Sequence, residues 1–324
     1  MTLHLLGMGH FHPENVLDNA FFESLDIGTN EAWILSRVGI HERRTVLSLD
    51  YIRETKNVDP RGAQEAATIS NPACGARAAE LAIERAGIAK EDIGMVICGG
   101  CSPQWVTPAE ASAVAMELGL DGIPCFDLHA ACSTFGTQVH VASQMGQGLP
   151  DHVLLVQLEN NTRCIDYRDR SGCVLWGDGA AAAVVSPRIE GRASIRRTTV
   201  GGSPQGAMDV VIPRMGYFAQ DGKKVHKFAI KRMTELYRQA REHCDRPEAL
   251  VYVGHQANLT MLKSVAKRVH PGAHWFNIDR FGNQGGAGSP CVISQRWDQI
   301  QPRTSVASVV VGAGLSWASV LIDF

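Results

Sequence analysis

The order of apolar strands and amphipathic helices along this chain occurs twice, and no other feature of the sequence constrains the fold more strongly. Short apolar runs predict strands, and apolar residues at helical spacing predict the helices between them. In the first half the predicted strands are 3–9, 94–98, 124–128, 153–157 and 173–185, and the predicted helices are 76–86, 109–118 and 132–145. In the second half the strands are 193–200, 250–253, 275–278, 306–311 and 317–322, and the helices are 225–242, 258–269 and 289–297.

Strands that alternate with helices predict an α/β fold with mostly parallel sheets covered by helices. The repeated order predicts an internal duplication, with an N-terminal half over residues 1–186 and a C-terminal half over residues 187–324. Within the first half, the segment at about 47–71 is rich in Asp, Arg, Asn and Pro. We expect it to be an irregular excursion with one short helix.

Charge and cysteine content narrow the class of protein. Lys and Arg number 31 against 33 Asp and Glu, so the net charge of −2 gives no reason to expect nucleic acid or membrane partners. No signal peptide or membrane-spanning apolar run is visible, which predicts a cytoplasmic protein without membrane insertion. The nine cysteines are scattered and are expected to be reduced. The close pair Cys98 and Cys101 has no partners to complete a zinc site, so metal or redox chemistry there is the weaker alternative.

Cys132 is the first candidate for chemistry. It stands in Asp127-Leu-His-Ala-Ala-Cys132-Ser-Thr-Phe-Gly136, where a predicted strand runs through small residues into a predicted helix. A thiol at the start of a helix faces free N–H groups and the positive end of the helix dipole, which lower its pKa. Small neighbours leave room for a bound acyl group. The alternative is a small buried hydrophobic residue, as most free cysteines are.

The second half supplies two further candidates. His255 follows the predicted strand that corresponds to the one before Cys132, and Asn283 lies in a Gly-rich turn one strand later. Ligands of open α/β sheets bind at the carboxyl ends of the strands, so these side chains are expected to lie together. The closing Val311-Gly-Ala-Gly314 supplies backbone N–H groups that could polarise a thioester carbonyl.

These residues resemble the Cys-His-Asn triad of the β-ketoacyl-acyl-carrier-protein synthase III family. Cys132 lies in a turn of small residues, His255 in His-Gln-Ala-Asn and Asn283 in Asp-Arg-Phe-Gly-Asn. Trp176-Gly-Asp-Gly-Ala180 and the segment from Gly312 to Ser319 also resemble family segments, and the resemblance covers almost the whole chain. It implies the thiolase fold, with two duplicated α/β halves in five α-β-α-β-α layers.

The resemblance also implies a reaction. An acyl group passes from an acyl thioester of coenzyme A or of a carrier protein to Cys132, and decarboxylative Claisen condensation with a malonyl thioester follows. His255 and Asn283 would hydrogen-bond the thioester oxygen as enolate charge grows. Backbone N–H groups of Cys132 and Ala313 would form the oxyanion hole. No metal or organic cofactor is implied, since the thioesters are substrates, and a homodimer is expected.

Binding residues are implied by the same resemblance. Trp33, Arg37 and Arg163 match family positions that contact coenzyme A, with Trp33 and Arg163 stacking on the adenine. Four basic residues could dock an acidic carrier protein, although a solvated helix face is the equal alternative; they are Lys227, Lys263, Lys267 and Arg268.

Departures from the family pattern concern mainly the acyl pocket. Val311 stands where a Phe usually shields the nucleophile, and Thr107 lies in the segment expected to form the partner-contributed wall of the acyl pocket. Thr260 stands where the family often has Arg. We therefore expect a specialised enzyme of fatty-acid or polyketide metabolism with an altered acyl pocket.

Two other functions fit the same fold. An acyltransferase that forms esters or amides would keep Cys132 and His255 but would not need Asn283. A non-catalytic partner subunit would usually lack the nucleophile, which this chain retains.

Overall fold

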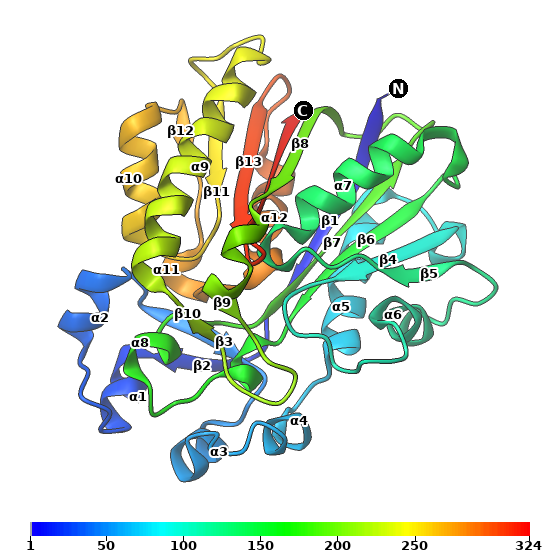
Figure 1. Ribbon diagram of the computed structural model, residues 1–324. Coiled ribbons are helices and arrows are strands. Elements are labelled where there is room, and N and C mark those ends of the chain that lie inside the picture. The colour runs from blue at the N-terminus through cyan, green and yellow to red at the C-terminus, as the bar shows by residue number, and fades with distance from the viewer. Residues whose placement is uncertain (1) are drawn as a thin grey trace.

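The computed structural model describes residues 2–324, and a ten-stranded mixed sheet runs through it (Figure 1). The strands of the first half are β1 (Leu3–Phe11), β4 (Met95–Gly99), β5 (Cys125–Asp127), β6 (Val153–Glu159) and β7 (Gly179–Ser186). Those of the second half are β8 (Ala193–Gly202), β11 (Val251–Gly254), β12 (Ala273–His274), β13 (Ser305–Gly312) and β14 (Ser316–Asp323). The order across the sheet is β12-β11-β13-β14-β8-β1-β7-β6-β4-β5.

The two halves of the sheet have the same topology. Counted outward from the centre, the first half runs β1-β7-β6-β4-β5 and the second runs β8-β14-β13-β11-β12. If the five strands of each half are numbered in chain order, both halves show the same spatial order, 1-5-4-2-3, from the centre outward. The halves join where β1 pairs antiparallel with β8, and the chain passes from one half to the other between Ser186 and Ala193.

The expectation of mostly parallel sheets is wrong. Strands β4, β5 and β6 pair in parallel, as do β11, β12 and β13, but β7 and β14 pair antiparallel with both of their neighbours. Between β13 and β14 the connection is a tight turn, and a turn of that length can join only antiparallel strands.

Helices cover both outer faces and fill the space between the halves. Helices α5 (Asn71–Ala86) and α6 (Glu110–Leu118) pack outside the first half, and α9 (Gly222–Glu242) with α10 (Leu259–Val269) packs outside the second. Helices α7 (Thr134–Met145) and α12 (Gly288–Arg296) contact strands of both halves and form the central layer (Figure 1). The predicted five-layer arrangement is thereby confirmed.

Small residues set how closely these layers approach. Helix α5 buries Ala78, Ala79 and Ala82 against β1. A Cβ on Gly9 of β1 would lie 1.9 Å from the carbonyl oxygen of Ala78, so only glycine permits this contact.

Several predicted boundaries differ from the structure. Helix α5 begins at Asn71 and not at 76, because Ser70 caps it by accepting from the Ala73 N–H and Pro72 stands in its first turn. The strand predicted over 173–185 begins at Gly179, since Arg170–Cys173 forms the short helix α8. The strand predicted over 275–278 is wrong, because β12 ends at His274 and helix α11 (Ile278–Phe281) follows.

The segment 47–71 contains two short helices and not one, α3 (Leu49–Thr55) and α4 (Gly62–Ala66). Further elements without a sequence prediction are β2 (Asn15–Asp18), α1 (Asn19–Ser24), α2 (Glu31–Arg37), β3 (Glu42–Thr45), β9 (Val210–Val211) and β10 (Ala219–Gln220). No helix of the described chain is both long and apolar enough to cross a membrane.

Candidate active site

Cys132 lies where the central layer begins, in the single-turn helix η2 (Ala131–Ser133) that leads into α7. Ala131 has a φ of 48°, a left-handed conformation that is uncommon for alanine and that bends the chain just before the thiol. The end of β13 packs against this turn so closely that a Cβ on Gly312 would lie 3.0 Å from the Cys132 nitrogen. Cys132 is half-buried and lies two residues before α7 begins, whereas the sequence predicts a helix that starts at Cys132 itself.

His255 directly follows β11 and is 6% exposed. The buried side chain of Gln256 connects its loop to the next one. Its amide nitrogen donates to the Gly254 carbonyl oxygen at 2.7 Å, and its Oε1 accepts from the Asn277 N–H at 3.1 Å. The His255 loop and the loop that carries Asn283 are therefore held as one unit.

Asn283 follows α11 and is also 6% exposed. Its Oδ1 accepts from the Gly285 N–H at 3.0 Å, which directs the amide NH₂ group to the opposite side. The Asn283 main chain pairs with the segment before β7: its N–H donates to the Leu175 carbonyl at 2.8 Å, and its carbonyl accepts from the Gly177 N–H at 3.1 Å. The Trp-Gly-Asp-Gly segment thus forms the support for Asn283.

Two cavities meet at Cys132. The first, of about 350 Å³, is lined by Cys132, His255 and Asn283 and extends to Trp33 and Arg37 on α2. The second, of about 310 Å³, shares Cys132, Trp176 and Ala313 with the first. Its lining includes Gly100, Cys101, Pro103, His129, Ala131 and Ala313. The three predicted catalytic side chains therefore converge on one cavity, although they come from three distant parts of the chain.

The surroundings of Cys132 favour its thiolate. The pKa of the Cys132 thiol lies well below its ordinary value, first because of a hydrogen bond with Cys101, whose Sγ is 3.7 Å from the Cys132 Sγ. His255 lowers this pKa further. The two effects together outweigh burial, which by itself would raise the pKa. Burial and the charge on Cys132 raise the pKa of the Glu159 carboxyl to about 8. Glu159 accepts from the Cys101 N–H at 3.0 Å and from the Gly286 N–H at 2.5 Å.

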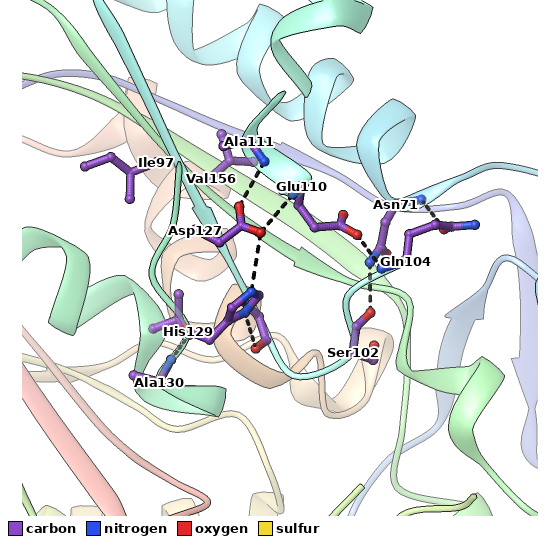
Figure 2. Close-up of polar contacts among 12 residues, drawn as sticks. Asn71, Ile97, Ser102, Gln104, Glu110, Ala111, Asp127, His129, Ala130 and Val156 are labelled. Carbon is purple, nitrogen blue, oxygen red and sulfur yellow. Dashed lines mark hydrogen bonds and ion pairs between the residues drawn. The ribbon is translucent and has the colours of Figure 1, made fainter. Parts of the chain in front are cut away.

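Figure 2 shows a polar network around Asp127, to which His129 of the second cavity's lining belongs. The Asp127 carboxylate accepts from the Glu110 and Ala111 N–H groups at the start of α6, at 2.8 and 2.9 Å. His129 points toward the same carboxylate, with its Nε2 3.6 Å from Asp127 Oδ2, and the carboxylate raises the pKa of His129. His129 Nδ1 lies 3.1 Å from the Gly100 nitrogen. The network joins the ends of β4 and β5 next to the nucleophile.

One predicted binding residue is wrong. Arg163 is 1% exposed and donates to the carbonyl oxygens of Asn160 and Ser102 and to the side chains of Gln64 and Gln104. A guanidinium buried in this way cannot stack on a ligand beside Trp33. Arg170 occupies that place instead, with its guanidinium carbon 4.9 Å from the centre of the Trp33 ring, and Arg37 lies 5.9 Å from the same ring.

The remaining predicted residues fall in different places. Val311 is buried at the end of β13 and lines the first cavity, whereas Thr107 lies in an exposed loop and lines neither cavity of its own chain. Its predicted contact across a dimer stays a prediction. The four basic residues predicted to dock a carrier are exposed on two neighbouring helices, Lys227 on α9 and Lys263, Lys267 and Arg268 on α10.

Sequence reasoning missed four residues of the site, which are Cys101, His129, Glu159 and Arg170. A signal was available for Cys101, since it follows β4 at the same carboxyl edge as Cys132. No group of three or more His, Cys, Asp or Glu side chains placed to hold a metal ion occurs within residues 2–324.

Comparisons with known proteins agree with this geometry. Residues 126–203 match the family model for 3-oxoacyl-[acyl-carrier-protein] synthase III, and residues 241–324 match the model for its C-terminal part. The β-ketoacyl-[acyl-carrier-protein] synthase III of Sulfurovum sp. is 30% identical, over 98% of this chain and 94% of that protein.

Solved structures give the same result. The 3-oxoacyl-[acyl-carrier-protein] synthase III of Aquifex aeolicus superposes with a TM-score of 0.87 at 27% identity, over 99% of this chain and 100% of its own. The priming β-ketosynthase of the R1128 polyketide pathway superposes with a TM-score of 0.83 at 27% identity, over 99% and 96% of the two chains. The resemblance and the fold expected from the sequence are confirmed.

Proposed function

This chain belongs to the β-ketoacyl-acyl-carrier-protein synthase III family of condensing enzymes, and we propose that Cys132, His255 and Asn283 carry out its reaction. The predicted condensing activity is confirmed by its relatives, among them a polyketide priming synthase. The observation that supports the residue roles is the convergence of the three side chains on one cavity.

In the first half-reaction, the Cys132 thiolate attacks the carbonyl carbon of an acyl thioester, and the thiol of the donor leaves. The negative oxygen of the tetrahedral intermediate would be held by the backbone N–H groups of Cys132 and Ala313. Both residues line both cavities, so the acyl group can extend into the second cavity while the donor thiol leaves through the first.

In the second half-reaction, a malonyl thioester enters the first cavity and loses carbon dioxide. His255 and the NH₂ group of Asn283 hydrogen-bond the thioester oxygen as enolate charge develops on it. The enolate carbon then attacks the acyl carbon, and the bond to the Cys132 sulfur breaks. Donors that are already in position cost no reorganisation at this step.

The rim of the first cavity suits coenzyme A. An indole ring and two guanidinium groups, from Trp33, Arg37 and Arg170, can stack on a purine and pair with phosphates. The exposed basic residues of α9 and α10 would attract an acidic carrier protein. Such substrates, and nine cysteines without a disulfide, support a cytoplasmic location.

Intact-protein mass spectrometry tests the nucleophile. After incubation with a panel of acyl-coenzyme A and acyl-carrier thioesters, we expect one acyl group on the native chain and none on Cys132→Ala. Addition of malonyl thioesters should then release a β-keto product. Loading that persists on Cys132→Ala would refute the assignment, and discharge only by an alcohol or an amine would favour the acyltransferase.

The roles of the other two residues can be separated from loading. We expect both His255→Ala and Asn283→Ala to become acylated, with slower loading in His255→Ala because His255 lowers the pKa of Cys132. Both should lose condensation by about 100- to 1,000-fold, since each removes one donor to the enolate oxygen. Product formation from preloaded enzyme measures this step. Normal condensation in both variants would contradict the roles assigned to the two side chains.

A binding variant tests the rim. Arg170→Ala should raise the KM for acyl-coenzyme A several-fold, because it removes a cation beside Trp33, and should leave loading from an acyl-carrier protein unchanged. Arg168→Ala is the matched control, since the Arg168 guanidinium pairs with Asp166 and is not one of the two that lie over the Trp33 ring. If the two substitutions changed the KM for acyl-coenzyme A equally, Arg170 would have no specific role in binding it.

A further inference from the structure

A second thiol lies next to the nucleophile. The Sγ of Cys101 is 3.7 Å from the Sγ of Cys132, a distance at which one thiol can donate its hydrogen to the other sulfur. Cys101 follows β4 and lines the second cavity, where the acyl group of the proposed reaction extends. It does not pair with Cys98, which is fully buried in β4.

The position of Cys101 is held by a buried carboxyl. Its N–H donates to Glu159 Oε2 at 3.0 Å, and the same oxygen accepts from the Asn161 side chain at 2.9 Å. The other oxygen of Glu159 accepts from the Gly286 N–H at 2.5 Å. The Cys101 backbone is therefore tied to the loop that follows Asn283.

The charges around the pair decide which sulfur keeps its proton. Cys132 stands at the start of a helix and beside His255, and both favour a negative sulfur there. The pKa of Cys101 lies well above its ordinary value, first because of the hydrogen bond to Cys132 and next because burial disfavours a negative sulfur. The proton shared by the pair thus stays on Cys101.

We propose that Cys101 is a further catalytic residue, whose S–H donates a hydrogen bond to the Cys132 sulfur whenever that sulfur is a thiolate. The proposal rests on the proposed role of Cys132 as nucleophile. Before acylation the bond raises the fraction of thiolate at neutral pH. In the acyl-enzyme the thioester sulfur is neutral, so the bond weakens.

The bond forms again at the end of the reaction. When the tetrahedral intermediate of condensation collapses, the carbon–sulfur bond breaks and its electron pair returns to Cys132. The Cys101 S–H stabilises this departing thiolate and keeps its own proton throughout. A thiol of lower pKa leaves faster, so one hydrogen bond assists both the start and the end of the cycle.

The pH profile of Cys132 alkylation by iodoacetamide tests the proposal without any acyl substrate. It is measured by peptide mapping, in the presence of a phosphine reductant that keeps both thiols reduced. In Cys101→Ala we expect the apparent pKa of Cys132 to rise by about one unit or more, which lowers alkylation by roughly tenfold at pH values below the native apparent pKa. Cys101→Ser keeps a donor and should retain most of the native profile.

Two controls make the result specific. Cys125→Ser changes a thiol of β5 whose Sγ lies 3.6 Å from the Ile123 carbonyl oxygen, and it should leave the profile unchanged. If the alanine variant does not fold, as judged by thermal unfolding, the nearly isosteric pair Cys101→Val and Cys101→Thr replaces it, and only the valine variant should raise the pKa.

A folded Cys101→Ala or Cys101→Val variant with the native alkylation profile would overturn the proposal. Failure of the proposed function would look different. In that case the native chain would show the low pKa at Cys132 and its dependence on Cys101, but would load no acyl group from any thioester.

Discussion

At the level of single residues, burial decides the chemistry of the carboxyl group beside the nucleophile. Glu159 is fully buried at the end of β6 and accepts hydrogen bonds from Cys101, Asn161 and Gly286. Three neutral donors do not offset the loss of water around a carboxylate, and the Cys132 thiolate adds repulsion. Its pKa of about 8, against an ordinary 4.5, means that Glu159 carries a proton at neutral pH.

This raised pKa predicts a pH-dependent stability. Between pH 4.5 and about 8, Glu159 is protonated in the folded chain and ionised in the unfolded one. Its contribution to stability is fully present below pH 4.5 and is lost as the pH rises toward 8. The free energy of unfolding should therefore fall by up to about 1.4 kcal/mol per pH unit in this window, relative to Glu159→Gln.

Urea unfolding at several pH values gives the free energy of unfolding of the native chain and of Glu159→Gln. The contributions of other titratable groups cancel in the difference between the two. Glutamine resembles the protonated acid, so the two chains should be closest in stability near pH 5 and the native chain should become relatively weaker by pH 8. Parallel curves would show that Glu159 ionises normally.

At the level of elements, the segment between α8 and β7 decides where Asn283 lies. Leu175 and Gly177 bond to the Asn283 main chain, and the buried Asp178 carboxylate accepts from the N–H groups of Val46 and Thr162. The segment thus connects β3, the loop after β6 and the Asn283 loop. This close packing requires glycine at position 177, because a side chain there would have no space.

Gly177→Ala tests this support. A Cβ at this position would lie 2.0 Å from the carbonyl oxygen of Phe281, and a backbone atom can yield only if the Asn283 loop moves. We expect condensation from preloaded enzyme to fall by at least about tenfold, since small misplacements of a catalytic group are costly. Acyl loading on Cys132 should change less.

Gly148→Ala is the matched control, because a Cβ at Gly148 would meet no atom within 4 Å. It should affect neither step. Equal losses of loading and condensation in Gly177→Ala would indicate general destabilisation and not a displaced Asn283.

At the level of the whole molecule, the first half of the sheet ends in an open strand. Strand β5 lies at the edge, and β4 bonds to the Pro124 carbonyl and to the Leu128 N–H. By the alternation of a strand, the N–H of Cys125 then faces away from β4. The apolar side chains of Trp105 and Val106 are exposed in the loop before α6. We propose that a second copy pairs at this edge to form the expected homodimer.

Proline at position 125 tests this arrangement, because it removes an outward N–H and leaves the bonds to β4 in place. Light scattering coupled to size exclusion should show a dimer for the native chain and for Cys125→Ser, and a monomer for Cys125→Pro. A folded Cys125→Pro dimer would place the interface elsewhere.

The sequence alone determined the order of most strands and helices, their duplication, and the placement of Cys132 before a helix and of His255 directly after a strand. These features are local, since periodicity and strand ends are properties of neighbouring residues. Tertiary structure alone decided that Arg163 is buried while Arg170 lies over Trp33, and that Cys101 contacts Cys132. Such outcomes depend on how remote segments pack against one another, and burial sets the protonation and accessibility of a side chain that no local pattern encodes.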